Sequence, residues 1–226
     1  MSKGGAGLSS KFRAYSRMEL AMKNSFELWR YAWKRRRFRV AIVFSALVLL
    51  VNLAVLPSFF QFLEQRPGAA LDDPVLCRLP PRDFSHPIFF LIYSALFYVI
   101  GRGIFSPGVF IRFATSYAIV LLMRVVTLYL TPLGPPAGLV PMPDPWTPLF
   151  SGAPALTQDL FFSGHTATAF LVFLSLTGKV EKLAALVLVA ALVVLLLYQH
   201  IHYTIDIVAA FPFAYLGYRI SKKAVP

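Results

Sequence analysis

Six predominantly apolar segments follow the first 39 residues of the chain. They are Val40–Pro57, His86–Gly101, Val109–Leu130, Phe161–Gly178, Leu183–Tyr198 and Tyr203–Ile220. A helix needs about 20 mostly apolar residues to cross a bilayer, and these segments reach or approach that length. The fifth and sixth segments are joined so closely that they must form an antiparallel hairpin. The pattern predicts an all-α, polytopic membrane protein with six transmembrane helices.

These segments divide the chain into three regions. We expect a basic N-terminal segment over 1–39, a six-span membrane domain over 40–221 and a short tail over 222–226. In the first region Phe26, Trp29 and Trp33 recur at helical spacing among Lys and Arg residues, which favours an amphipathic helix at the membrane surface. A disordered basic tail that only sets the topology would have the same composition.

A proline-rich connection joins the third and fourth apolar segments. Residues 131–158 contain eight prolines, which excludes a continuous helix, yet they also include the apolar Trp146, Leu149 and Phe150. This composition predicts either an apolar cap over the outer end of the membrane domain or a rigid linker.

The overall composition agrees with a membrane protein. Hydrophobic residues make up 58% of the chain and charged residues 14%, against about 25% charged residues in soluble domains. The net charge of +12 raises the question of a nucleic-acid partner, but the cations crowd into the N-terminal region and beside the apolar segments, where topology and anionic lipid account for them. The single cysteine, Cys77, excludes an internal disulfide, and no Cys/His spacing typical of a metal site is present. We therefore expect membrane lipids as partners, and no nucleic acid.

The distribution of Lys and Arg predicts the orientation. Of the 22 such residues, eighteen lie before the first segment or on the same side of the predicted spans, and only Arg66, Arg78 and Arg82 lie on the opposite side. Because cytoplasmic connections carry the excess of positive charge, both termini are predicted to be cytoplasmic.

Four polar residues stand where apolar ones would be expected: Arg124, His165, His202 and Asp206. With this orientation, all four fall near the outer ends of three separate spans. Ionisable groups within a bilayer are costly and typically mark function. The sequence therefore predicts one site on the outer (periplasmic, extracellular or lumenal) face, in which Arg124 supplies a permanent cation.

The spacing of these residues suits phosphoryl chemistry. His202 and Asp206 share one helical face, so the carboxylate can orient the imidazole and make its other nitrogen a better nucleophile. His165 follows Ser163 and Gly164 at a helix start, where free backbone N–H groups favour a phosphate oxygen. One histidine would attack phosphorus while the other protonates the leaving alkoxide.

Three other interpretations fit part of the pattern. His202 and Asp206 alone could be a satisfied polar pair in a helix bundle. His165, His200, His202 and Asp206 together could hold zinc, although Arg124 would repel the cation. Proton transport through the same groups is a different class of function, but no polar path continues toward the cytoplasmic half.

Two motifs resemble those of sphingomyelin synthases. Asp159–Thr166 (DLFFSGHT) resembles the D-x3-S-G-H-T core of that family, and His202–Ile207 (HYTIDI) resembles its H-Y-T-x-D-V motif. The third apolar segment, with Tyr117 and Arg124, also resembles the family pattern, and the likeness covers about residues 112–220. S-G-H followed by H-x3-D is shared with the wider type 2 phosphatidic acid phosphatase superfamily.

The resemblance implies a reaction and a set of roles. It implies transfer of phosphocholine or phosphoethanolamine from a glycerophospholipid donor to a lipid alcohol such as ceramide, with release of diacylglycerol and with no metal or organic cofactor. It implies His202 as the nucleophile, Asp206 as the group that orients it, and His165 as the acid and then the base. Further residues are implied to contact the substrate: Tyr117, Arg124, Asp159, Ser163, Gly164 and Tyr203.

The chain departs from the family at several positions. Thr157-Gln158 replaces a C-G pair, Phe211 replaces a tyrosine, and Pro80–Asp83 only partly resembles a P-L-P-D motif. The resemblance therefore leaves the head group and the acceptor open, and a lipid phosphate phosphatase is the alternative. A phosphomonoester is close to a dianion and calls for several cations, whereas Arg124 is the single cation at this depth. That difference favours a phosphodiester substrate, and so head-group transfer.

Overall fold

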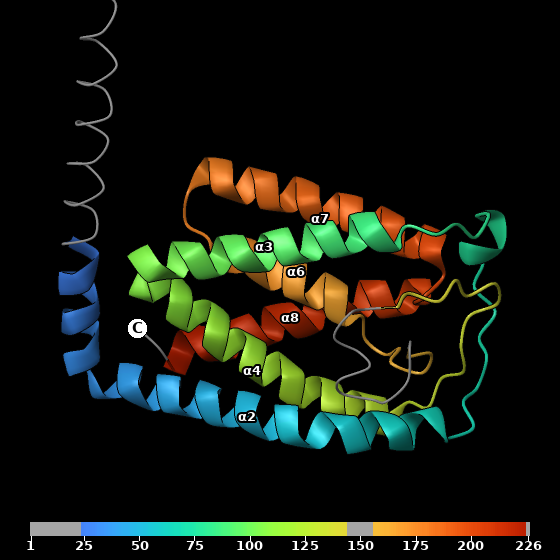
Figure 1. Cartoon of the computed structure of the whole chain (residues 1–226), viewed down its shortest axis with the longest axis horizontal. Coiled ribbons are helices and arrows are strands. Elements are labelled where there is room, and N and C mark those ends of the chain that lie inside the picture. The colour runs from blue at the N-terminus through green and yellow to red at the C-terminus, as the bar shows by residue number, and fades with distance from the viewer. Residues whose placement is uncertain (1–23, 144–155, 225–226) are drawn as a thin grey trace, which may run out of the picture.

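The computed structural model describes residues 24–143 and 156–224, and most of these residues are helical. The main helices are α2 (Arg36–Glu64), α3 (Ser85–Phe105), α4 (Pro107–Leu130), α6 (Gly164–Ser175), α7 (Lys179–Gln199) and α8 (Thr204–Ala224). A 3₁₀ turn, η1, covers Leu76–Arg78, and residues 24–34 form a further helix. The six main helices run along one direction (Figure 1), with the connection 65–84, the described residues 131–143 and 156–163, and the turn 200–203 at one end.

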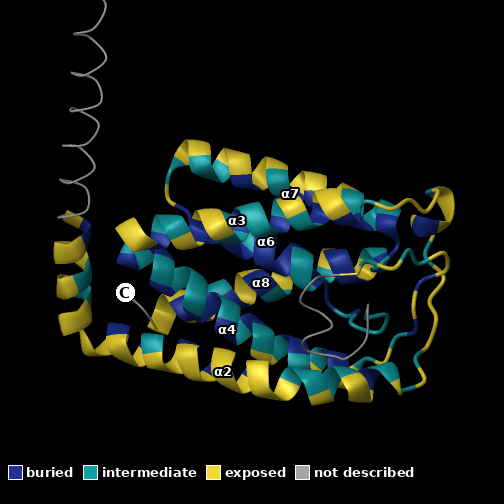
Figure 2. Cartoon of the chain, in the orientation of Figure 1, coloured by how far each residue is buried: buried dark blue, intermediate teal, exposed yellow. Residues whose placement is uncertain are grey.

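Helix α4 is the centre of the bundle. It packs against α2, α3, α6 and α8, whereas α2 and α7 lie on the outside and expose most of their surface (Figures 1 and 2). Small residues let the helices approach closely, as is usual in membrane bundles. Ala167, Ala210 and Ala214 are fully buried between α6, α8 and α4, and a Cβ at Gly217 would lie 2.7 Å from Val120 Cγ2. The apolar outer faces of α2 and α7 are those expected to face lipid.

The all-α membrane architecture predicted from the sequence is confirmed, but the count of six spans is not. Among the described residues, four helices are long and apolar enough to cross a membrane: α2, α3, α4 and α7. Helix α6 has only 12 residues and is about 18 Å long, because the backbone becomes extended at Leu176. Helix α8 is long enough, but it carries Asp206 in its first turn and Lys222 and Lys223 in its last.

The connections at one end of the bundle are tied together. The backbones of residues 68–69 and 132–134 meet in an isolated parallel bridge, with Ala69 N donating to Pro132 O at 3.1 Å and Gly134 N to Ala69 O at 2.9 Å. At Gly68 a Cβ would overlap the backbone of Leu133, so only glycine fits this crossing. Residues 144–155 of the proline-rich connection lie outside the described part of the chain, and so do the predicted cap residues Trp146, Leu149 and Phe150.

Candidate active site

The start of α6 forms one wall of the site. Ser163 is fully buried and caps the helix, because its Oγ accepts the N–H of Thr166 at 3.3 Å. Its own N–H donates to the carbonyl oxygen of Asp206 at 3.0 Å, which fastens the start of α6 to the start of α8. The hydroxyl predicted to bind substrate is therefore occupied in positioning the helix that carries His165.

The structure brings the two predicted histidines together. The rings of His165, in the first turn of α6, and His202, just before α8, have centroids 6.3 Å apart and meet edge to face. His202 is only 3% exposed. A phosphorus atom held between the two rings would be within reach of both, as an attacking group and a proton donor require.

Asp206 lies beside His202 as the spacing predicts, but at ion-pair distance. Nδ1 of His202 is 3.7 Å from Oδ2 of Asp206, which is longer than a hydrogen bond. The same Oδ2 accepts the N–H of Tyr203 at 3.0 Å, so the carboxylate also completes the start of α8. Because Nδ1 faces the carboxylate, Nε2 is the nitrogen left for the substrate, and positive charge on the ring would draw the pair closer.

Arg124 is paired with an acidic residue. Its Nη2 donates to Oδ1 of Asp159, and the guanidinium is nearly buried. The same group lies directly over the backbone of Gly164, where a Cβ would collide with it. Arg124 is thus the predicted cation beside His165, but with Asp159 it forms a pair of opposite charges.

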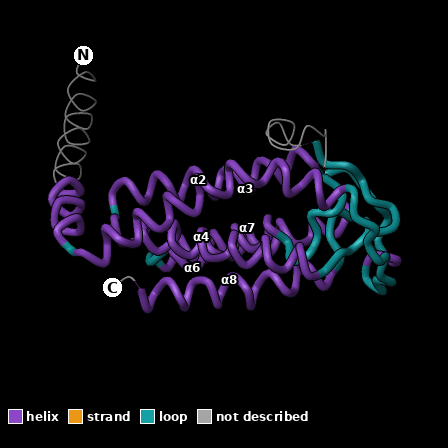
Figure 3. Tube along the Cα trace, turned by 90° about the horizontal axis from the view of Figure 1, so that it is seen from below, coloured by secondary structure: helices purple, strands orange, loops and turns teal. Residues whose placement is uncertain are grey.

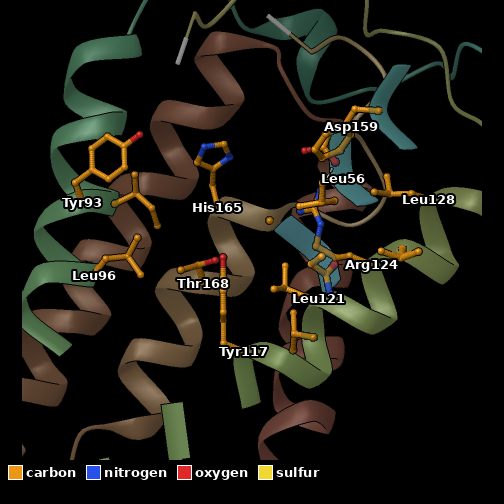
Figure 4. Close-up of a pocket in the computed structure, with 16 residues that line it drawn as sticks. Leu56, Tyr93, Leu96, Tyr117, Leu121, Arg124, Leu128, Asp159, His165 and Thr168 are labelled. Carbon is orange, nitrogen blue, oxygen red and sulfur yellow. Dashed lines mark hydrogen bonds and ion pairs between the residues drawn. The ribbon is translucent and has the colours of Figure 1, made fainter. Parts of the chain in front are cut away.

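A cavity of about 240 Å³ opens beside this pair. Figure 4 shows His165, Arg124 and Asp159 around its upper part, and Tyr117 and Leu121 of α4 farther down. The lining comes from α2, α3, α4 and α6 and is mostly apolar below the charged groups. The arrangement has a polar head and an apolar body, like a lipid.

Tyr203 is a predicted substrate contact that does not line this cavity, and Ser163 and His202 do not line it either. The Tyr203 hydroxyl donates to Gly134 O at 3.0 Å and accepts the N–H of Leu71 at 3.1 Å. Its ring lines cavities among the connections at this end of the bundle and not the cavity next to His165. Tyr203 therefore ties the connections to the start of α8.

His200, considered above for a metal site, lies in the turn after α7. Its Nδ1 is 3.0 Å from the carbonyl oxygen of Ala137, and its backbone is left-handed, with φ +56°. Within the described parts of the chain, no three His, Cys, Asp or Glu side chains gather in a way that could hold a metal ion.

Two acidic residues outside the motifs, Glu64 and Asp73, each accept hydrogen bonds from a segment that carries site residues. Oε1 of Glu64, the last residue of α2, accepts the N–H groups of Thr157 at 2.7 Å and Gln158 at 2.9 Å, and Oε2 accepts the Thr157 hydroxyl at 2.7 Å. This fixes the segment that leads into Asp159.

Asp73 binds the start of α8 in a comparable way. Its Oδ2 accepts the N–H of Thr204 at 2.6 Å and its Oδ1 accepts the Thr204 hydroxyl at 3.0 Å. Burial alone would raise the pKa of Asp73, but hydrogen bonds from Thr204, Leu76 and Val75 together hold it below its ordinary value. The Asp73 carboxylate thus caps α8, which carries Asp206 and begins two residues after His202.

Residues 158–223 match a family model described as PAP2 superfamily C-terminal. The matched segment contains Asp159, His165, His202 and Asp206, and it supports membership of the type 2 phosphatidic acid phosphatase superfamily. With the apolar helices, it also supports an integral membrane enzyme of the lipid phosphatase or phosphotransferase kind. The comparison with curated proteins gave no match.

Proposed function

We propose that this protein is a membrane lipid phosphotransferase of the sphingomyelin synthase type. It moves phosphocholine or phosphoethanolamine from a glycerophospholipid to ceramide or another lipid alcohol and releases diacylglycerol. The observation that carries the proposal is the Arg124–Asp159 pair, next to His165 and at the head of an apolar cavity. The resemblance of Asp159–Thr166 and His202–Ile207 to that family supports it.

The charges of the pair suit a zwitterionic head group. Arg124 can hold the phosphodiester, which has one negative charge, while Asp159 faces the ammonium group of the same head group. A phosphomonoester has nearly two negative charges and no cation, so Asp159 would repel it. The sequence argument counted Arg124 as a lone cation, and its pairing with Asp159 strengthens the preference for a phosphodiester.

The reaction proceeds in two displacements. Nε2 of His202 attacks phosphorus and the bond to the diacylglycerol oxygen breaks, while His165 gives its proton to that oxygen. The product of this step is a phosphohistidine that carries the whole head group. In the second step His165 removes the proton of the acceptor hydroxyl, whose oxygen attacks phosphorus and breaks the bond to Nε2. Asp206 stabilises the positive charge on the His202 ring in the first step.

The topology is also part of the proposal. Helices α6 and α8 complete a six-span domain, both termini lie on the cytoplasmic side and the site faces the opposite side. Cys77 is exposed in the connection beside the site. An impermeant thiol reagent added to intact cells should therefore label the native protein and fail to label a Cys77→Ser variant. Labelling that requires permeabilised cells would reverse the orientation.

A lipid phosphate phosphatase is the second candidate, because the superfamily match supports either kind of reaction. In that case water would take the place of the acceptor alcohol and the substrate would be a phosphomonoester such as phosphatidic acid.

One experiment distinguishes the two candidates. Purified protein should release diacylglycerol from phosphatidylcholine or phosphatidylethanolamine faster than it releases phosphate from phosphatidic acid. The trapped intermediate should have the mass of the whole head group, be absent in His202→Ala, and pass to added ceramide or another lipid alcohol. Rapid phosphate release from phosphatidic acid without head-group transfer would establish the phosphatase and reject the transferase.

A further inference from the structure

The helix formed by residues 24–34 lies across the end of the bundle that is far from the site. Figures 1 and 3 both show it running roughly at right angles to α2, beside the C-terminal end of α3 and the N-terminal end of α4. Trp29 fixes it there. Its Nε1 donates to Ile104 O at 2.9 Å, and its ring meets Phe38 and Phe110 edge to face, with centroids 5.8 and 5.4 Å away. The helix is therefore attached to the membrane domain at the level where the spans end.

Most side chains of this helix are sorted by polarity, with the buried Ser25 and the exposed Tyr31 as exceptions. Trp29 and Ala32 face the bundle, and the neighbouring Phe26 and Trp33 share one flank and are 67% and 51% exposed. On the face away from the bundle, Arg30 is exposed beside Glu27. The apolar arc thus faces the membrane-spanning bundle. The exposed rings of Phe26 and Trp33 extend beyond the surface that the bundle covers.

Four arginines cluster where this helix turns into α2. Arg35, Arg36, Arg37 and Arg39 are all exposed, and no acidic side chain forms an ion pair with any of them within the described residues. Such a cluster beside an aromatic surface at the end of a membrane span matches the head-group layer of an anionic leaflet.

We propose that residues 24–39 form a binding surface for anionic phospholipids. Phe26 and Trp33 insert at the boundary between head groups and acyl chains, and the four arginines contact lipid phosphates. The occupant is lipid and not a soluble polyanion, because Trp29 holds the apolar arc at the level of the bilayer surface. The surface lies far from His165 and His202, so it attaches and orients the protein and takes no part in the reaction.

The position of Trp33 can be measured by fluorescence in lipid nanodiscs. The Trp146→Phe protein keeps Trp29 as the anchor, and the difference between its spectrum and that of Trp33→Phe/Trp146→Phe gives the contribution of Trp33. The Trp33 emission should shift to shorter wavelength, and brominated acyl chains should quench it. The quenching should be stronger with phosphatidylglycerol than with phosphatidylcholine alone, and it should weaken at high salt, which screens exposed charges. Emission typical of water, without quenching in either lipid, would overturn the proposal.

Lipid retention tests the arginines. Native mass spectra should show severalfold less bound phosphatidylglycerol when Arg35, Arg36, Arg37 and Arg39 are all changed to glutamine. The matched control, Arg78→Gln/Arg82→Gln in the connection at the other end, should retain lipid as the wild type does. Unchanged retention in the fourfold variant would reject the surface. RNA binding that survives in nanodiscs and exceeds lipid binding would also reject it, in favour of a nucleic-acid partner. An unchanged thermal midpoint in detergent shows that the fourfold variant is folded.

Discussion

The Glu64→Ala substitution tests whether the clamp at the end of α2 controls the site. It removes three hydrogen bonds from the Thr157–Gln158 backbone and the Thr157 hydroxyl, and leaves the rest of α2 unchanged. Hydrogen bonds to a charged group contribute about 1.5–3 kcal/mol each. The segment is half-buried and water replaces part of the loss, so a net cost of about 2–3 kcal/mol is reasonable for keeping Asp159 beside Arg124.

At about 1.4 kcal/mol for each factor of ten, this cost corresponds to a fall of roughly 30- to 150-fold in kcat/KM. The loss should depend on the donor, because Asp159 is proposed to face the ammonium group. We expect the full loss with phosphatidylethanolamine or phosphatidylcholine. A smaller loss is expected with phosphatidylglycerol, which has the same phosphodiester charge but no cation.

The assay is diacylglycerol release by purified variants from the three donors at matched acyl chains. Glu64→Gln keeps one acceptor oxygen and should fall between wild type and Glu64→Ala. Glu27→Ala, which removes an exposed carboxylate paired with Arg30, is the matched control and should leave activity unchanged. An equal loss with all three donors would mean that Glu64 supports only the fold. No loss with any donor would refute the clamp.

Three further changes test other parts of the site. His165→Ala should slow reaction with ordinary lipid donors by orders of magnitude, but much less with a p-nitrophenyl leaving group; equal losses on both would remove His165 as the general acid. Gly164→Ala places a Cβ against the guanidinium and should reduce turnover at least tenfold, about the effect of 1.4 kcal/mol, whereas Gly101→Ala, which meets nothing within 4 Å, should not. The pKa of Asp73 in the folded protein is below its unfolded value of about 3.9. The ionised carboxylate therefore stabilises the fold at pH values above about 3.9, and this stabilisation is lost as the pH falls through the folded pKa. The thermal midpoint of Asp73→Asn should therefore lie below wild type at neutral pH and approach it in acid; a gap that stays constant with pH would show that the charge is not involved.

Hydropathy and local motifs predicted the helices and indicated the candidate site residues, because both depend on residues near one another in sequence. His165 follows its helix start directly, and His202 and Asp206 are four residues apart. The length of α6 was not predictable in the same way, since the apolar run continues to Gly178 while the helix ends at Ser175. Composition cannot distinguish an extended apolar segment from one more turn of helix.

The sequence also did not reveal which residues pair with one another at the site. Arg124 meets Asp159 across 35 residues, Glu64 meets Thr157 across 93, and Asp73 meets Thr204 across 131. Such contacts depend on how the connections fold over the end of the bundle, for which neither periodicity nor spacing carries a signal. Tyr203 shows the same limit, because its place in the motif did not reveal that its ring contacts the connections 65–84 and 131–143.

The residues of the candidate site come from two parts of the chain. The matched segment, 158–223, carries the two histidines and Asp206, and the residues before it carry Arg124, Glu64 and Asp73. Glu64 fixes the approach to α6 and Asp73 fixes the start of α8. Each proposed clamp therefore holds one of the two segments whose histidines would meet around phosphorus in the proposed reaction. A relative that conserves only the matched segment would keep the reacting groups without these supports. The choice of head group is therefore expected to depend on Glu64 and Arg124, which precede the matched segment, together with Asp159 within it.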